Sequence, residues 1–88
     1  MIRYRVLVAG RVQGVYFRDT CRRVASQHGV SGWVRNLPDG RVEAVLEGPS
    51  DGVEQVAAWA RHGPAGAVVT DVSVLPEQPR GLSGFRVR

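Results

Sequence analysis

The sequence contains no lysine, because all twelve of its basic residues are arginine. Schiff-base chemistry and any phosphate loop that depends on a lysine are therefore excluded. What remains is a net charge of +4, which attracts phosphoesters and nucleic acids alike. The charge by itself does not choose between these partners.

Cysteine is almost absent as well. Cys21 is the only one in the chain, which excludes an internal disulfide and a cluster of thiolate metal ligands. Because Cys21 falls on the apolar stripe of a predicted helix, we interpret it as a small buried hydrophobic residue rather than a reactive thiol.

Long apolar runs are also missing, so no segment can span a bilayer. Residues 1–5 lead directly into a strand pattern without the apolar core of a signal peptide. We therefore expect a cytoplasmic protein with no membrane partner. The 88 residues, 43% of them hydrophobic, are enough for one globular domain, residues 1–88, which we expect to be a monomer.

Apolar periodicity and turn residues divide the chain into seven predicted elements. Strands are predicted over residues 2–8, 30–37, 41–47, 68–75 and 85–87, and helices over 17–28 and 50–62, with Ser50 as the N-cap of the second helix. The order is β-α-β-β-α-β with a short fifth strand at the C-terminus. It predicts an α+β, ferredoxin-like sandwich, an antiparallel sheet with both helices on one face.

This topology brings two distant segments to one edge of the sheet. The first and second strands run parallel, with the third between them, so their carboxyl ends meet. The loop Gly10–Phe17 and the side chain of Asn36 are then expected about two strand spacings, or ~10 Å, apart. An arginine side chain and a phosphate group can fill that gap.

The loop itself has the properties of an anion site. It joins a strand to a helix N-terminus, where main-chain N–H groups lack partners and the helix dipole is positive. Gly10 and Gly14 permit the dihedral angles that turn consecutive amides inward. Arg18, in the first helical turn, can place its guanidinium over two phosphate oxygens. Two glycines in a loop also have a purely structural interpretation, which remains open here.

Asn36 has two interpretations, a turn former and a side chain that orients water. No convincing general acid or base accompanies it. His28 closes the first helix far from the loop, His62 is interpreted as the C-cap of the second helix, and Asp19 as a favourable charge in the first helical turn. An alkyl phosphate generally needs acid or metal assistance, whereas an acyl phosphate expels a carboxylate that leaves unprotonated. The residues therefore favour an acyl phosphate.

Two long motifs resemble the acylphosphatase family. Residues 8–18 follow the signature V-x-G-x-V-Q-G-V-x-F-R, and residues 32–43 follow G-W-V-x-N-x-x-D-G-x-V-E. The resemblance continues through the rest of the chain, at Trp59, Gly63-Pro64, Ala67, Val69, Val72 and Gly84-Phe85.

The resemblance implies a hydrolase that converts an acyl phosphate to a carboxylate and orthophosphate, without metal or other cofactor. It implies that Arg18 is catalytic, that Asn36 orients the attacking water, and that main-chain amides surround the phosphate. Those amides belong to Gly14, Val15, Tyr16, Phe17 and Arg18.

Two functions other than a free-standing enzyme are alternatives for this sequence, a nucleic-acid-binding domain and a module of a larger protein. RNA-recognition domains share this order of elements, but their bases stack on aromatic residues, and strand 41–47 has two acids and no aromatic residue. We therefore expect no nucleic-acid partner. The second alternative is a phosphate-sensing or carbamoyl-phosphate-handling module of a larger protein, and the sequence favours a free-standing enzyme over it.

Overall fold

Seven elements follow one another in the predicted order. The computed structural model describes all of residues 1–88. Its elements are β1 (Ile2–Arg11), α1 (Phe17–Gln27), β2 (Ser31–Asn36), β3 (Val42–Gly48), α2 (Ser50–Ala60), β4 (Val68–Glu77) and β5 (Phe85–Val87). Neither helix has the length and apolarity that crossing a membrane requires.

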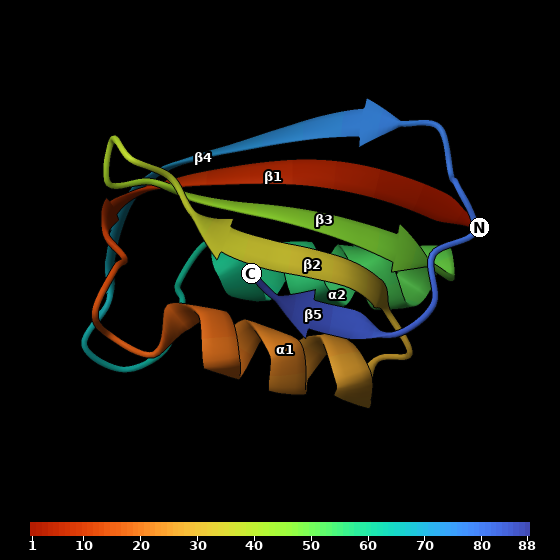
Figure 1. Cartoon of the computed structure of the whole chain (residues 1–88), viewed down its shortest axis with the longest axis horizontal. Helices are drawn as coiled ribbons and strands as arrows, with labels where there is room; N and C mark the ends of the chain where they lie inside the picture. Colours follow the sequence, from red (N-terminus) through yellow and green to blue (C-terminus); the bar gives the residue numbers. More distant parts are fainter.

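The five strands form one sheet in the order β4-β1-β3-β2-β5, shown from top to bottom in Figure 1. The first four strands pair antiparallel, with β3 between β1 and β2 as the sequence predicts. The α+β ferredoxin-like prediction is therefore confirmed. The fifth strand adds a feature that was not expected, because β5 runs parallel to β2 and makes the sheet mixed.

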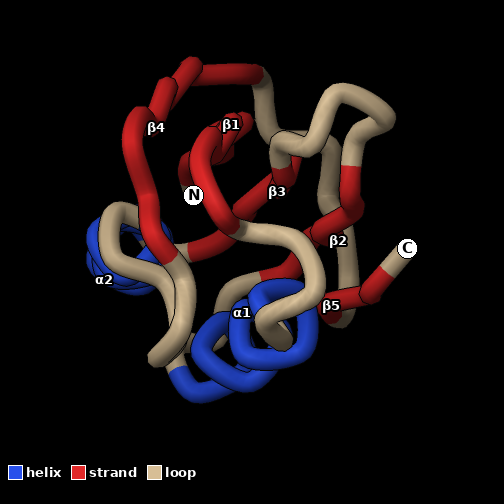
Figure 2. Tube along the Cα trace, turned by 90° about the vertical axis from the view of Figure 1, so that its left-hand side faces the viewer, coloured by secondary structure: helices blue, strands red, loops and turns tan.

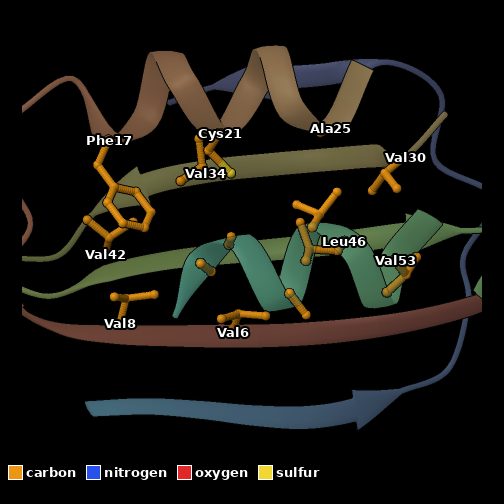
Figure 3. Close-up of a cluster of buried hydrophobic side chains, with 14 of the residues drawn as sticks. Val6, Val8, Phe17, Cys21, Ala25, Val30, Val34, Val42, Leu46 and Val53 are labelled. Atoms are coloured by element: carbon orange, nitrogen blue, oxygen red, sulfur yellow. The ribbon is translucent and has the colours of Figure 1, made fainter. Parts of the chain in front are cut away.

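Both helices cover one face of the sheet, which is clearest when the sheet is viewed from its end (Figure 2). Alternate residues of the strands face them and are fully buried. Figure 3 shows this core between the helices and the strands, with Val6, Val8, Val34, Val42, Leu46 and Val53 among its members. Cys21 is 2% exposed and belongs to the same core, as predicted.

The other face of the sheet has no helix over it, yet its central strand is buried there too. Glu43 and Glu47 of β3 are each 1% exposed. Glu43 lies between two arginines, with Arg5 Nη2 at 2.5 Å and Arg35 Nε at 2.6 Å from its oxygens. On this face arginine side chains cover Glu43 of the central strand, whereas on the other face the helices cover its apolar side chains.

The start of α2 differs from the prediction. Ser50 is the first helical residue, and Pro49 is the N-cap, with no side-chain hydrogen bond to the helix. Pro49 has φ −56° and ψ 141°, so the chain is still extended there and turns into the helix one residue earlier than a serine cap would require. The helix ends at Ala60 with Arg61 as its C-cap, so His62 is not the cap.

Candidate active site

The loop between β1 and α1 leaves the sheet through an irregularity in the pairing of β1 with β4. The register shifts between Ala9 and Gly10. Gly10 has φ +122°, and a Cβ at this position would lie 2.1 Å from the carbonyl oxygen of Val68. Only glycine fits this close approach, so Gly10 fixes the direction in which the loop departs.

Two residues of the loop take the left-handed conformation. Gly14 has φ +73°, and Tyr16 has φ 61° and ψ 25°. Alternation of left- and right-handed residues turns successive N–H groups toward one point, which creates a concave anion site. Tyr16 is also the N-cap of α1, and no side chain accepts a hydrogen bond from the first turn. The helix N-terminus is thus left open toward the loop.

A cavity of about 380 Å³ lies between this loop and the ends of β2 and β5. Its lining residues are Val12, Gly14, Tyr16, Phe17, Arg18, Asp19, Asn36 and Val87. The loop, Arg18 and Asn36, which the topology predicted at one edge of the sheet, therefore meet in one cavity. This edge, with the β1–α1 loop and the arrowhead of β2, is on the left in Figure 1.

The other two expected binding residues contribute differently. Phe17 is 2% exposed, and its ring packs against Trp59 with centroids 5.0 Å apart. This contact anchors the first turn of α1 in the core. Val15 does not line the cavity and packs against the core. Phe17 therefore offers a ligand its main chain alone, and the expected contribution of Val15 stays a prediction.

Asn36 is the last residue of β2 and pairs with Val42 of β3. Its Oδ1 atom is buried and has no hydrogen-bond partner. A buried polar atom without a partner costs about 1–3 kcal/mol, and such atoms are rare in folded proteins. The oxygen of Asn36 is therefore a free acceptor beside the open helix N-terminus.

Arg18 is half-buried, and its Nη1 donates a hydrogen bond of 2.9 Å to the main-chain carbonyl oxygen of Arg88. No aspartate or glutamate side chain lies within ion-pair distance of Arg18. Its neighbour Asp19 pairs instead with Arg22 at 3.0 Å and Arg23 at 3.9 Å. Arg18 also lines the cavity, where its guanidinium is the one cationic side chain.

Sequence reasoning missed two contributors to this site. The Nε2 atom of Gln13 donates to the carbonyl oxygens of Leu37 and Arg41, at 2.9 and 3.0 Å, and so ties the loop to the β2–β3 turn. Val87 lines the cavity from β5. The only sequence feature that could have indicated Gln13 is its place in the first motif. Nothing in the sequence indicated Val87, because the position of β5 in the sheet could not be derived from it.

The other titratable groups do not enter the cavity as acids or bases. Neither His28 nor His62 lines it. Burial raises the pKa of Cys21 to about 12, so its thiol stays protonated at neutral pH. No three His, Cys, Asp or Glu side chains lie close enough together to hold a metal ion. The polar groups of the lining residues are main-chain amides, the guanidinium of Arg18, the carboxamide of Asn36, the carboxylate of Asp19 and the hydroxyl of Tyr16.

The model of the family described as Acylphosphatase matches residues 4–87. The chain belongs to the acylphosphatase family. It is 58% identical to an acylphosphatase of Trichormus variabilis over 88 residues, which cover 100% of this chain and 87% of that protein.

Solved acylphosphatase structures agree with this assignment. The acylphosphatase of Bacillus subtilis superposes with a TM-score of 0.96 at 37% identity, covering 100% of this chain and 99% of that one. The structure of HypF from T. kodakarensis matches with a TM-score of 0.86 at 30% identity, and there the matched part covers 12% of that chain. The same fold thus occurs alone and within a longer protein.

Proposed function

We propose that this chain hydrolyses acyl phosphates to a carboxylate and orthophosphate. The main-chain N–H groups of residues 14–18 and the guanidinium of Arg18 hold the phosphoryl group. Asn36 accepts a hydrogen bond from the attacking water and aims its oxygen at phosphorus. The open helix N-terminus and the place of Arg18 in the cavity lining both support the first assignment.

The observation that carries the proposal is that Asn36 lines the same cavity as Arg18 while its buried Oδ1 has no hydrogen-bond partner in the protein. A carboxamide does not remove a proton near neutral pH, but it orients a water that donates to it. Positioning of this kind removes much of the entropic part of a reaction barrier. On this proposal, the Oδ1 atom lacks a hydrogen-bond partner within the protein because it binds the attacking water during the reaction.

The chemistry of the leaving group fits the scarcity of acids and bases. The water oxygen forms a bond to phosphorus as the bond from phosphorus to the acyl oxygen breaks. The carboxylate departs with the electron pair and needs no proton, because the pKa of its conjugate acid is about 4. The proton of the water passes to a phosphate oxygen of the substrate. Phosphoryl transfer of this type needs mainly positioning and charge stabilisation, so we propose that it requires no metal.

The test is hydrolysis of benzoyl phosphate, compared with a phosphate monoester and repeated with a chelator. We expect hydrolysis of the acyl phosphate alone, unaffected by the chelator. Arg18→Ala removes the charge that stabilises the transition state, so kcat/KM should fall about 10³-fold, with weaker substrate binding. A matched control is Arg22→Ala, one turn further along α1 and outside the cavity, which should keep wild-type kinetics.

Asn36→Ala separates binding from turnover. We expect kcat to fall about 10²-fold while inorganic phosphate still binds, because the carboxamide acts on water and not on the phosphoryl group. The binding of phosphate is measured by calorimetry. Wild-type kcat in Asn36→Ala would show that the assigned role of Asn36 is wrong.

We expect no nucleic-acid partner. The acidic residues in the middle of the open sheet face, Glu43 and Glu47, are buried, and the central strand offers no aromatic ring for stacking. Tight RNA binding with a steep dependence on salt would contradict this expectation.

A further inference from the structure

The cavity is larger than a phosphoryl group requires. A water occupies about 30 Å³ in the liquid, and a phosphate has five heavy atoms, so it needs only a few times that volume. The cavity holds about 380 Å³, within the range of sites that enclose small organic molecules. Space therefore remains beside the loop amides after a phosphoryl group has bound.

Apolar side chains form a large part of the remaining wall. Five large hydrophobic side chains of this protein are exposed by two-fifths or more, and two of them, Tyr16 at 83% and Val87 at 42%, line this cavity. Val12, which is 1% exposed, contributes a third apolar side chain. The polar groups come from the loop amides, from Arg18 and Asn36, and from Asp19, whose carboxylate pairs with Arg22 and Arg23. The cavity thus has a polar part suited to phosphate and an apolar part that the phosphate does not use.

Tyr16 is the only residue other than glycine with a positive φ. A bulky side chain in the left-handed region costs about 1–2 kcal/mol, a cost that glycine avoids. The loop already uses glycine for this purpose at Gly14, with φ +73°. An exposed tyrosine in a conformation that glycine adopts freely indicates that its side chain has a use, and the strain points to function.

We propose that Tyr16 and Val87 form the binding site for the acyl group of the substrate, and that this site favours acyl phosphates with an aromatic acyl group over acetyl phosphate. A flat aromatic group gains stacking and apolar contact with the tyrosine ring, whereas a methyl group is too small to reach both walls. The assignment of the phosphoryl end rests on the proposed function. The acyl site adds to it a substrate class and a residue that determines specificity.

Binding without turnover gives the first test. Acyl phosphates become stable to hydrolysis when a methylene replaces the bridging oxygen, which gives 2-oxo-2-phenylethyl phosphonate for benzoyl phosphate and 2-oxopropyl phosphonate for acetyl phosphate. By calorimetry, the wild-type protein should bind the phenyl compound about five- to tenfold more tightly, the factor that one good aromatic contact provides. Tyr16→Gly should remove most of this preference, because it should weaken the binding of the phenyl compound more than the binding of 2-oxopropyl phosphonate.

Turnover gives the second test. The acyl group is held alike in the ground state and the transition state, so losing its contact raises KM and leaves kcat unchanged. Tyr16→Gly should raise KM for benzoyl phosphate about five- to tenfold more than it raises KM for acetyl phosphate. Tyr16→Phe keeps the ring and should keep the wild-type ratio of the two KM values. Leu75→Ala removes another exposed hydrophobic side chain, 45% exposed on β4 and outside the cavity, and should change neither substrate.

The outcomes separate the two proposals. Because glycine adopts φ +61° freely, Tyr16→Gly should remain folded, which its thermal unfolding midpoint checks. If Tyr16→Gly weakens both phosphonates equally, Tyr16 acts only through the loop backbone, and the acyl site is wrong; it is also wrong if neither changes. If the wild type prefers the phenyl phosphonate but hydrolyses no acyl phosphate, the acyl site stands and the proposed function fails. If neither phosphonate binds, both are wrong.

Discussion

One face of the sheet is buried by two helices and is made of aliphatic side chains, whereas the other is buried in part by arginines and encloses carboxylates. Antiparallel sheets commonly leave their second face to the solvent. Here β3 is buried on both faces, at all seven of its residues. On the open face the carboxylate of Glu43 lies between arginine side chains from the neighbouring strands, and the carboxylate of Glu47 accepts main-chain N–H groups of the segment between β4 and β5 and pairs with Arg3.

The comparison shows how a short chain completes a two-sided core with only two helices. Arginine carries a long aliphatic stem that covers apolar surface, and a planar guanidinium that bonds a carboxylate in a fixed geometry. Arg5 and Arg35 are 41% and 45% exposed at their side chains while Glu43 between them is 2% exposed. The two faces are therefore stabilised by different interactions. Apolar packing stabilises one face, and ion pairs whose strength depends on pH stabilise the other.

The largest effect should come from breaking the helix-covered face. Leu46 on β3 is 1% exposed and belongs to the core in Figure 3. Leu46→Ala removes its buried methyl groups and leaves a cavity, so we expect a loss of about 3 kcal/mol in the free energy of unfolding. Urea denaturation measures it, and the loss should be the same at pH 4 and pH 7. A loss below 1 kcal/mol would mean that this face is less tightly packed than the structure shows.

A smaller effect should follow from breaking the open face at Glu47. Its two oxygens accept the main-chain N–H groups of Arg80 and Leu82, both at 2.7 Å, and Arg3 Nη1 lies 3.4 Å away. Glu47→Gln leaves one N–H facing an amide donor, so we expect a loss of about 2 kcal/mol. Hydrogen exchange at Arg80 and Leu82 should accelerate more than in the strands.

The control for Glu47 is Glu77→Gln. Glu77 also pairs with Arg3, at 2.9 Å, but its side chain is 33% exposed at the edge of the sheet. Water replaces its contacts readily, so the loss should stay below about 0.5 kcal/mol. Equal losses in the two variants would show that the main-chain bonds of Glu47 contribute little.

An effect smaller than that at Glu47, but larger than that of the Glu77 control, is expected at Glu43 and depends on pH. Burial by itself would raise the pKa of Glu43, but hydrogen bonds from Arg35 and Arg5 outweigh it and hold the pKa below its usual value. The ionised carboxylate therefore stabilises the folded state above the pKa of the unfolded chain, about 4.3, and this contribution is lost as the pH falls through the lower folded pKa. We expect Glu43→Gln to cost about 1 kcal/mol at pH 7, since its partners are partly solvated.

Unfolding of wild type and Glu43→Gln across the range from pH 7 to pH 2.5 checks this sign. The difference in stability should be constant above about pH 5 and should shrink below about pH 4. A difference that grew on acidification would mean that the pKa of Glu43 is raised and not lowered. Leu46→Ala, which changes no titratable group, provides the pH-independent reference for the other face.

The helix-covered face could be predicted from the sequence, and the open face could not. Alternation along residues 2–8 and 41–47 predicts which side chains face the helices, because one periodic pattern determines both the strand and its buried side. The same pattern treats Glu43 and Glu47 as polar residues in solvent. Glu43 is buried by arginines from other strands, and Glu47 is bound by the segment between β4 and β5. Such tertiary contacts are not contained in the hydrophobic period of one strand.

The candidate site also has a part that could be predicted from the sequence and a part that could not. Its two halves, the loop with Arg18 and the end of β2 with Asn36, were predicted to meet because strand order follows from the succession of elements, and the structure places both in one cavity. The contribution of Val87 was not predictable. Three residues of β5 carry too little periodicity to indicate their partner, and their parallel pairing with β2 is a tertiary contact.

Gln13 connects these halves in a way that bears on how substrate enters. Its amide bridges the β1–α1 loop and the β2–β3 turn, which are separated in sequence by more than twenty residues. The groups that hold phosphate and the group that aims water then form one stiff frame, with their spacing set when the chain folds. A substrate can therefore dock without any closing motion, and we expect its association rate to be governed by diffusion and charge rather than by a hinge.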